Sequence, residues 1–398
     1  MSDTNAKNVG AVIKGPTAPI TIINNFNGET RSANNLIRFV DLPNLDTPVY
    51  GREVEANMLA NFFATHNRHC AVVAPSCFGK TFLIRKFLQN VNANDEFYKD
   101  SFNQIIYFNC REITDTGSII GKFETCLGGK IEPTSFFSLI ADKKILCIFD
   151  NFESWNDNRE AIHFLHNIFN ANDELRTIFV SQTSIGDENL NDKITELREI
   201  GNLLFRGLDK QAALNFARTE GKKVNLNNVS EEKLIEFFFI VHYIPQAIRS
   251  LIGYLSRKRR TFEDFLAKYQ AEFADYENSP TRFINVNDEL RPTLYLIQLQ
   301  IEAQDEGSKT LLSVLSFFES DVPESVVAAF SPQVSAVEKE TIHSLSDNWL
   351  VVETKFSAKT ANEPNSATIR LIPLSNKFRE TFCRNLKTKT QAPLNLLQ

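Results

Sequence analysis

The sequence predicts an α/β protein, in which a parallel sheet covered by helices is followed by a helical domain and then by a winged-helix domain. Short apolar runs of strand length alternate with helical patterns between about residues 39 and 184. Continuous apolar strands separated by helices are typical of a parallel sheet that is buried on both faces. From residue 201 to about residue 273 only helical periodicity is found, and two β-prone runs follow near the end. These three patterns, in this order, predict the architecture.

The α/β domain is expected to span residues 39–200. Its predicted strands are short, continuous apolar runs at 70–74, 105–109, 145–150 and 177–181. Its predicted helices carry apolar residues at helical spacing and lie at 52–65, 80–91, 136–140 and 159–170. Because helices connect the strands, the strands are expected to run parallel.

The second half of the chain is expected to hold two further domains. Residues 201–290 predict a helical domain, and residues 291–390 predict a winged-helix domain. The latter contains β-prone runs at 350–356 and 368–372 and a last helix near 376–385. Helices followed by a hairpin in this way resemble a winged helix.

The first 38 residues are rich in Asn, Thr and Gly and are too polar to bury a core. We expect a flexible tail there. The segment also contains a β-prone stretch at 20–26, which leaves open a short signalling motif that stacks as cross-β when clustered.

Composition narrows the classes of function. The net charge of −6 over 398 residues argues against a general nucleic-acid binder. The sequence has no apolar run near the ~20 residues that span a bilayer, and its start lacks the layout of a signal peptide. The six cysteines form no C-x-x-C pair, which favours buried free thiols. We therefore expect a cytoplasmic protein without a membrane segment.

The segment "APSCFGKT" resembles a phosphate-binding loop. It lies between a predicted strand and a predicted helix, where unpaired amides and the helix dipole favour a phosphate. Lys80 would reach the β- and γ-phosphates, and the Thr81 hydroxyl would bind Mg²⁺. The other interpretation is a chance match. The residues expected to contact the nucleotide here are Ala74, Pro75, Ser76, Cys77, Phe78, Gly79, Lys80, Thr81 and Phe82.

One position of this loop departs from the usual pattern. Ala74 stands where the first glycine is expected, whereas Gly79 keeps the second. Alanine is tolerated there if its φ is negative and is costly if φ must be positive.

A second acidic strand, "ILCIFDNFE", follows at a suitable distance. Asp150 ends the strand, where its carboxylate can hold Mg²⁺ through the water shell. Glu153 can orient or deprotonate a water that attacks the γ-phosphate. The alternative is that Asp150 caps the following turn and that Glu153 is only solvated. The next strand ends in Ser181, Gln182 and Thr183, which can contact a phosphate or cap a turn.

Together these motifs resemble the STAND class of P-loop NTPases, which contains the NB-ARC and NACHT proteins. "VYGREVEANML" at 49–59 is similar to the segment of that class whose backbone wraps the adenine, so Val49, Tyr50 and Arg52 are expected at the base. "HYIPQAIRSL" is similar to its G-x-P motif, whose proline, here Pro245, packs near the adenine. "LLFRGLDKQAALNFA" resembles the start of its helical domain, and "IRLIPLSNKFRE" its winged-helix segment.

The resemblance implies a switch that binds ATP or ADP with Mg²⁺. It implies slow ATP hydrolysis, a change of conformation, and assembly with a second copy or a protein partner. Three residues depart from the class: Ala74 in the loop, Thr183 at the usual sensor arginine, and Ile372 at the histidine that touches the ADP β-phosphate. A nucleotide-binding scaffold that does not hydrolyse ATP therefore stays open.

A DNA-binding regulator with an ATPase module is the other alternative. Its recognition helix would be 336–350, which carries Lys339 as its basic residue and more acidic than basic residues. Recognition helices need surface Arg or Lys, so this composition disfavours DNA as the partner.

Overall fold

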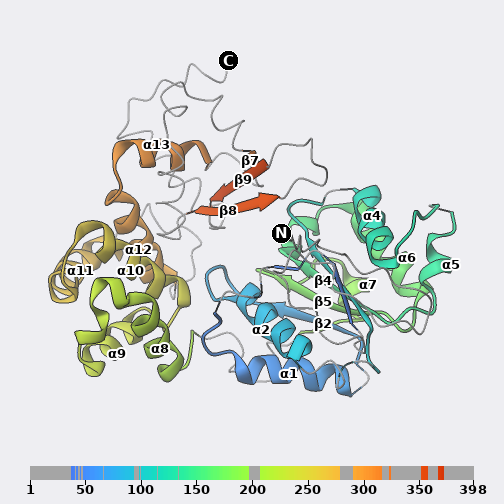
Figure 1. The fold of residues 1–398 in the computed structure, drawn as a ribbon, viewed down its shortest axis with the longest axis horizontal. Coiled ribbons are helices and arrows are strands. Elements are labelled where there is room, and N and C mark those ends of the chain that lie inside the picture. Colours follow the sequence, from blue (N-terminus) through green and yellow to red (C-terminus); the bar gives the residue numbers. More distant parts are fainter. Residues whose placement is uncertain are drawn as a thin grey trace, which may run out of the picture. The chain divides into compact units, whose positions relative to one another are not determined.

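The computed structural model describes residues 37–40, 42–43, 45, 48–65, 67–93, 98, 100–113, 115–132, 134–196, 207–277, 290–315, 322–323, 351–356 and 366–371. The chain forms two compact units, of which the first comprises residues 1–75 and 80–205 and the second comprises residues 206–398 together with the loop residues 76–79 (Figure 1). The candidate recognition helix 336–350, the last predicted helix and Ile372 lie outside the described residues.

The first unit is built on a six-stranded parallel sheet with the order β1-β3-β4-β5-β2-β6. Its strands are β1 Arg38–Val40, β2 His69–Val73, β3 Gln104–Asn109, β4 Ile145–Asp150, β5 Arg176–Ser181 and β6 Thr195–Glu196. Every residue of β2, β4 and β5 is buried, as expected for strands covered on both faces. The predicted α/β class with a parallel sheet is confirmed, and the four predicted strands agree within one residue.

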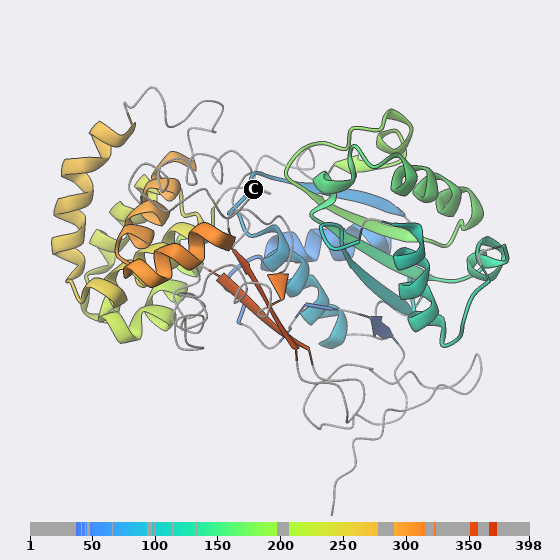
Figure 2. The ribbon, with the colours of Figure 1, turned by 90° about the horizontal axis from the view of Figure 1, so that it is seen from above.

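Helices cover both faces of this sheet (Figures 1 and 2). One apolar core joins the sheet to α1 and α2, and a second joins it to α4, α5 and α6. The helices are α1 Glu53–Ala64, α2 Lys80–Ala93, α4 Thr116–Leu127, α5 Phe136–Ile140, α6 Arg159–Ala171 and α7 Glu188–Asn191.

Aromatic stacking across adjacent strands fills the second core. Phe108, Phe149 and Phe179 are in register on β3, β4 and β5. The ring centroids of the first pair lie 4.8 Å apart and those of the second pair 5.2 Å apart, with nearly parallel planes. Many of the phenylalanines are therefore core residues, since stacked rings bury large apolar surfaces.

The second unit contains helices and a small antiparallel sheet. Strand order in this sheet is β7-β9-β8, with β7 Val322–Pro323, β8 Val351–Phe356 and β9 Ser366–Leu371. The two predicted β-prone runs thus pair with each other, in antiparallel register. The helices are α8 Lys210–Glu220, α9 Glu231–Ile240, α10 Pro245–Lys258, α11 Phe262–Glu277, α12 Arg291–Glu302 and α13 Glu306–Leu315.

Helix starts follow the capping rules. The Asp115 side chain accepts from the amide of Ser118 at the start of α4, at 2.8 Å, and Asp209 accepts from Ala212 in α8, at 2.8 Å. These carboxylates satisfy amides that lack a partner in the first turn. Helix α10 begins at Pro245, a residue suited to the first helical position.

The turn before α10 has an unusual backbone. His242 and Tyr243 both have positive φ, 52° and 54°. The Leu208 amide donates to the Tyr243 carbonyl at 2.8 Å, and a side chain at Gly207 would overlap the backbone of both turn residues. A glycine at 207 is therefore required by close backbone approach.

Within the described part of the chain, no single helix is both long and apolar enough to span a bilayer. Helices α9 and α10 meet that test only together, and they are bent by 119° where they join.

His69, the first residue of β2, is buried at the amino-terminal edge of the sheet. Its ring stacks on Phe169, with centroids 4.2 Å apart, and its Nδ1 lies 3.0 Å from the Thr177 hydroxyl. Burial, and then the positive charges of Arg68, Lys193 and Arg176, lower the pKa of His69 from 6.5 to about 3. The imidazole is therefore neutral at physiological pH.

The low pKa predicts that His69 makes the fold sensitive to acid. The unfolded chain binds a proton at His69 below its ordinary pKa of 6.5, whereas the folded chain does so only near pH 3. Above pH 6.5 His69 is neutral in both states and does not affect the balance between them. Below pH 6.5 the free energy of unfolding falls as the pH is lowered. At pH 5 the loss is about 2 kcal/mol relative to pH 8.

Urea denaturation of the wild type and of His69→Gln at pH 8 and pH 5 measures this contribution. The wild type should lose more free energy of unfolding on acidification than the variant does. Equal losses in the two proteins would show that His69 does not carry this sensitivity.

Candidate functional site

The loop after β2 lies at the carboxyl edge of the parallel sheet. β2 ends at Val73 and α2 begins at Lys80, as the sequence predicts. In this loop Cys77 and Gly79 adopt positive φ, 73° and 87°, whereas Ala74 does not. The Ala74 amide donates to the Ser181 carbonyl of β5 at 3.2 Å and so continues the strand pairing. The departure from glycine at Ala74 therefore causes no backbone strain.

The Lys80 side chain folds back over this loop. Its Nζ donates to the carbonyl oxygens of Ala74, at 2.8 Å, and Pro75, at 3.1 Å. The ammonium is thereby held beside the loop and the first turn of α2, whose amides and dipole also favour an anion. Three sources of positive potential thus meet at this turn.

Asp150 is the most buried acid of the site, with 2% of its surface exposed. Its Oδ2 accepts from the Thr81 hydroxyl at 2.9 Å and from the Tyr107 hydroxyl at 2.5 Å. Its Oδ1 accepts from the Asn151 amide at 2.9 Å. A buried carboxylate needs such donors, because an unpaired one would be costly. The alternative that Asp150 only caps the following turn does not explain the contacts from α2 and β3.

Glu153 lies in the short 3-10 helix Phe152–Trp155 that follows β4, with 19% of its side chain exposed. Arg111 Nη2 is 3.2 Å from its Oε1. The Gln182 side chain donates to Oε1 at 2.8 Å, and the Gln182 amide donates to Oε2 at 3.1 Å. Both oxygens are therefore engaged, and the alternative of a merely solvated Glu153 does not hold.

Tyr107 and Arg111 are not among the residues that the sequence predicts for this site. Tyr107 is in β3 and Arg111 follows it, and β3 pairs with β4 in a register that sets Asn109 beside Asp150. One feature of the sequence could have indicated them: both are polar residues near the carboxyl end of a predicted strand. The carboxyl ends of parallel strands meet at one edge of a sheet, so these residues were candidates for contact with the acidic strand. Among the three residues ending β5, Gln182 contacts Glu153, whereas Thr183 accepts from Asn156 at 3.3 Å.

Residues next to Val49, Tyr50 and Arg52 contact α2, so this segment lies beside that helix. Gln89 of α2 donates to the Leu45 carbonyl at 2.7 Å, and Lys86 lies 3.1 Å from Glu53. The Arg52 side chain is buried and donates to Glu55 at 2.7 Å, while its backbone is left-handed, with φ 71°. At Arg52, therefore, the backbone suits contact with a base and the side chain does not.

The other predicted contact residues occupy varied environments. Phe78 is buried, whereas Pro75, Ser76 and Cys77 are partly exposed. The Phe82 ring lies under the Arg85 guanidinium, 5.1 Å from its centroid. Pro245 lies in the second unit, and its contact with a base stays a prediction.

Cys110, which follows β3, does not act as a nucleophile. Burial, followed by the charges of Asp150 and Glu153, raises the pKa of its thiol well above the ordinary value. The thiol stays protonated, and only a thiolate is reactive.

The arrangement suits a phosphate with a bound divalent cation. The Thr81 hydroxyl and the Asp150 carboxylate converge within 2.9 Å of each other, directly after the loop that carries the amides and Lys80. Hard oxygen donors of this kind are what Mg²⁺ prefers, and Mg²⁺ keeps several waters when it binds through one or two protein groups and a phosphate.

Comparison with known proteins gives distant similarities of fold. No family model matches the sequence, and no curated protein matches it. Among solved structures, a STAND protein with a tetratricopeptide repeat sensor from Pyrococcus horikoshii is similar at 16% identity and a TM-score of 0.46, over 87% of this chain. This chain spans 44% of the length of that protein.

Two other solved structures are similar at a comparable level. The Aeropyrum pernix ORC1 protein in complex with DNA has 11% identity and a TM-score of 0.39, over 87% of this chain and 95% of its own. AMPPCP-bound DnaA from Aquifex aeolicus has 15% identity and a TM-score of 0.37, over 75% of this chain and 96% of its own. These values are too low to assign the chain to a family.

The hydrogen bond from Tyr107 to Asp150 generates a test of the site's structure. Tyr107→Phe removes one donor from a buried carboxylate and should lower the free energy of unfolding by about 2 kcal/mol, because hydrogen bonds to charged groups contribute about 1.5–3 kcal/mol. Urea denaturation followed by circular dichroism measures the change. A matched Tyr295→Phe variant removes a hydroxyl that donates to the solvent-exposed Glu272 carboxylate, at 3.0 Å, and should cost less. Equal costs would contradict a special role for Tyr107.

Proposed function

We propose that this chain binds ATP with Mg²⁺ at the loop after β2 and hydrolyses it slowly as part of a conformational switch. The observation that carries the proposal is the 2.9 Å hydrogen bond between Thr81 and Asp150. It joins the first turn of α2 to the end of β4, where a phosphate-bound cation needs its two protein groups. A helix cap or a chance loop match would not require this convergence.

The phosphates would be bound by backbone and charge together. In this proposal the amides of residues 76–80 surround the β-phosphate, and the Lys80 ammonium moves from the carbonyls of Ala74 and Pro75 to the phosphate oxygens. Thr81 binds Mg²⁺ directly, and Asp150 holds its water shell. The positive φ of Cys77 and Gly79 supports this role, since successive amides in such turns form concave anion sites.

Glu153 would act on the attacking water. It accepts the water's proton while the water oxygen bonds to the γ-phosphorus and the bond to the leaving ADP oxygen breaks. Arg111 and Gln182 position its carboxylate, with contacts of 2.8–3.2 Å. Slow hydrolysis is the expectation taken from the STAND class that the sequence resembles.

The switch and its assembly rest on the motifs at 49–59 and around Pro245. In the STAND class that these motifs resemble, the bound nucleotide controls the conformation and the self-association of the protein. A ligand biases such an equilibrium only through different contacts in the two states, and the γ-phosphate would supply that difference. We extend this behaviour to the present chain, with a second copy or another protein as partner.

A nucleotide-binding scaffold without hydrolysis is the second candidate. The contacts of Glu153 favour it, because Arg111 and Gln182 already engage both carboxylate oxygens, which a water would have to reach. Both candidate functions use the same ATP-binding site, and they differ in whether the bound ATP is hydrolysed.

Loss of the Lys80 charge should abolish nucleotide binding. Lys80→Ala is expected to weaken the affinity for Mg·ATP about 100-fold or more, since charge-assisted contacts to phosphate contribute about 1.5–3 kcal/mol each and the ammonium makes several. Isothermal titration calorimetry measures this. Lys143→Ala removes a lysine of the same unit that pairs with Asp142, outside the proposed site, and this variant should bind as the wild type does. Equal affinities of wild type and Lys80→Ala would reject the site.

Replacing the proposed base should separate binding from hydrolysis. Glu153→Gln keeps the shape of the side chain, so Mg·ATP should bind as in the wild type while phosphate release falls about 100-fold, the usual contribution of a general base. In the presence of ATP, light scattering after size-exclusion chromatography should show a larger assembled fraction for Glu153→Gln than for the wild type. A wild type that releases no phosphate above the level of Glu153→Gln, yet binds ATP, would favour the scaffold.

A further inference from the structure

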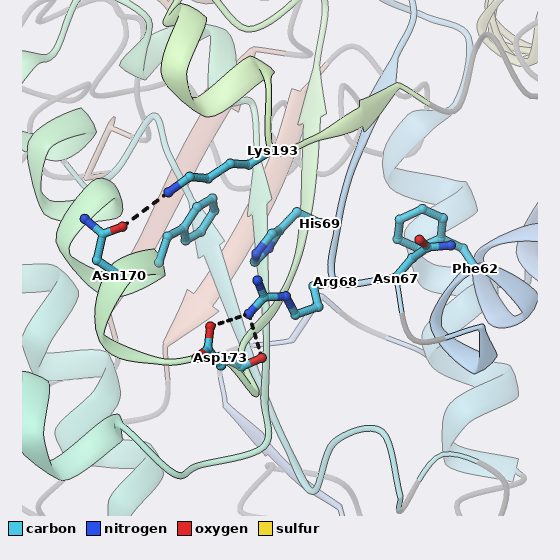
Figure 3. A pocket seen from close by; sticks show the side chains of 8 residues that line it. Phe62, Asn67, Arg68, His69, Asn170, Asp173 and Lys193 are labelled. Atoms are coloured by element: carbon cyan, nitrogen blue, oxygen red, sulfur yellow. Dashed lines mark hydrogen bonds and ion pairs between the residues drawn. The ribbon is translucent and has the colours of Figure 1, made fainter.

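A cavity of about 500 Å³ opens at the amino-terminal edge of the sheet, at the other end of β2 from the phosphate loop (Figure 3). β2 has five residues, so about 13 Å separate its two end residues. The volume is within the range of small-molecule sites. Phe62, Asn67, Arg68, His69, Phe169, Asn170, Asp173 and Lys193 line the cavity.

Positive charge exceeds negative charge in this cavity. Arg68 and Lys193 are its two cations, and among the described residues that line it Asp173 is the single acid. The Asp173 side chain is 95% exposed to solvent, so its charge is strongly screened. An anion can therefore be attracted without displacing a buried carboxylate.

The two cations are held by contacts that leave donors for a ligand. Arg68 uses one nitrogen, Nη1, for both the Asp173 carbonyl, at 2.7 Å, and its Oδ1, at 3.0 Å. Lys193 Nζ donates to the Asn170 side chain at 3.2 Å. Figure 3 shows both side chains extending toward the segment that carries Asn170 and Asp173. A guanidinium has five N–H groups and an ammonium three, so these contacts use only part of each set.

The rings that line the cavity are largely buried and carry no charge. His69 and Phe169 stack with an interplanar angle of 12°, and Phe62 lines the cavity as well. Because the His69 pKa is lowered to about 3, the ring adds no charge at neutral pH. The same shift reflects the positive potential of Arg68 and Lys193 at this point. The wall thus suits the flat or apolar body of a ligand whose anionic group faces the two cations.

We propose that this cavity binds a small organic anion, a carboxylate or a phosphate ester, between Arg68 and Lys193. It is a site separate from the proposed nucleotide site and is independent of it. The shared chemistry is an oxyanion that accepts charge-assisted hydrogen bonds from both side chains. The two possible sources, carboxylate and phosphate, are distinguished by the probes used.

The test uses the full chain with Lys80→Ala, so that phosphate bound at the loop after β2 does not contribute. Succinate, inorganic phosphate and chloride are added at equal ionic strength, and the melting temperature and the heat of binding are measured. Succinate or phosphate should raise the melting temperature in a saturable way, whereas chloride should not. The better probe identifies the anionic group.

Two substitutions locate the binding. In the Lys80→Ala chain, Lys193→Met and Arg68→Gln should each weaken the binding of the effective probe about tenfold, as expected when one charge-assisted contact is lost. Lys143→Met removes an exposed lysine of the same unit that pairs with Asp142, and it should leave the affinity unchanged. Both cavity side chains are at the surface, so either variant should fold.

Three outcomes would overturn the proposal. They are no saturable effect of either anion, an effect that chloride reproduces, or an affinity that neither cavity variant changes. No nucleotide is used, so a failure of the ATP proposal would leave this result interpretable, and the reverse also holds.

Discussion

The buried carboxylate of Asp150 is the constraint on which the site depends. Removing a charge from water costs several kcal/mol unless donors replace the lost hydration. Here the donors come from three elements: Thr81 of α2, Tyr107 of β3 and the amide of Asn151 after β4. The hydrogen bonds to this one buried charge therefore link α2, which follows the loop after β2, to the centre of the sheet. A ligand cation at this point would meet groups that are already positioned.

The carboxyl ends and the amino ends of the parallel strands carry different sets of polar groups. Because all six strands run in one direction, their carboxyl ends collect the phosphate loop, Asp150, Glu153 and Gln182 at one edge. The amino ends collect His69 and the cations beside it at the other edge. β2 contributes to both edges. The cavity beside His69 and the proposed nucleotide site thus lie at opposite ends of the same parallel strands.

Left-handed backbone conformations occur around the proposed nucleotide site, as they do at His242 and Tyr243 before α10. Gly51 and Arg52 before α1, and Cys77 and Gly79 in the loop, have positive φ. For a residue with a side chain this conformation costs on the order of 1 kcal/mol and is kept only where the surroundings demand it. Ala74 is free of this strain, so the replacement of a usual glycine does not weaken the loop. Within the loop, the residue with a side chain that adopts positive φ is Cys77.

Hydrophobic periodicity and the motif "APSCFGKT" determined the α/β class, the four longer strands of the parallel sheet, and the placing of Lys80, Thr81, Asp150 and Glu153 after strands. These features are local, so neighbouring residues suffice to reveal them. The short strands β1 and β6 have too few residues for a period and form only by pairing with β3 and β2. Only the tertiary structure decided that Tyr107 holds Asp150, that Arg111 holds Glu153, and that Arg68 and Lys193 share a cavity. These partners lie far apart in sequence, and the register between strands, which no local pattern encodes, brings them together.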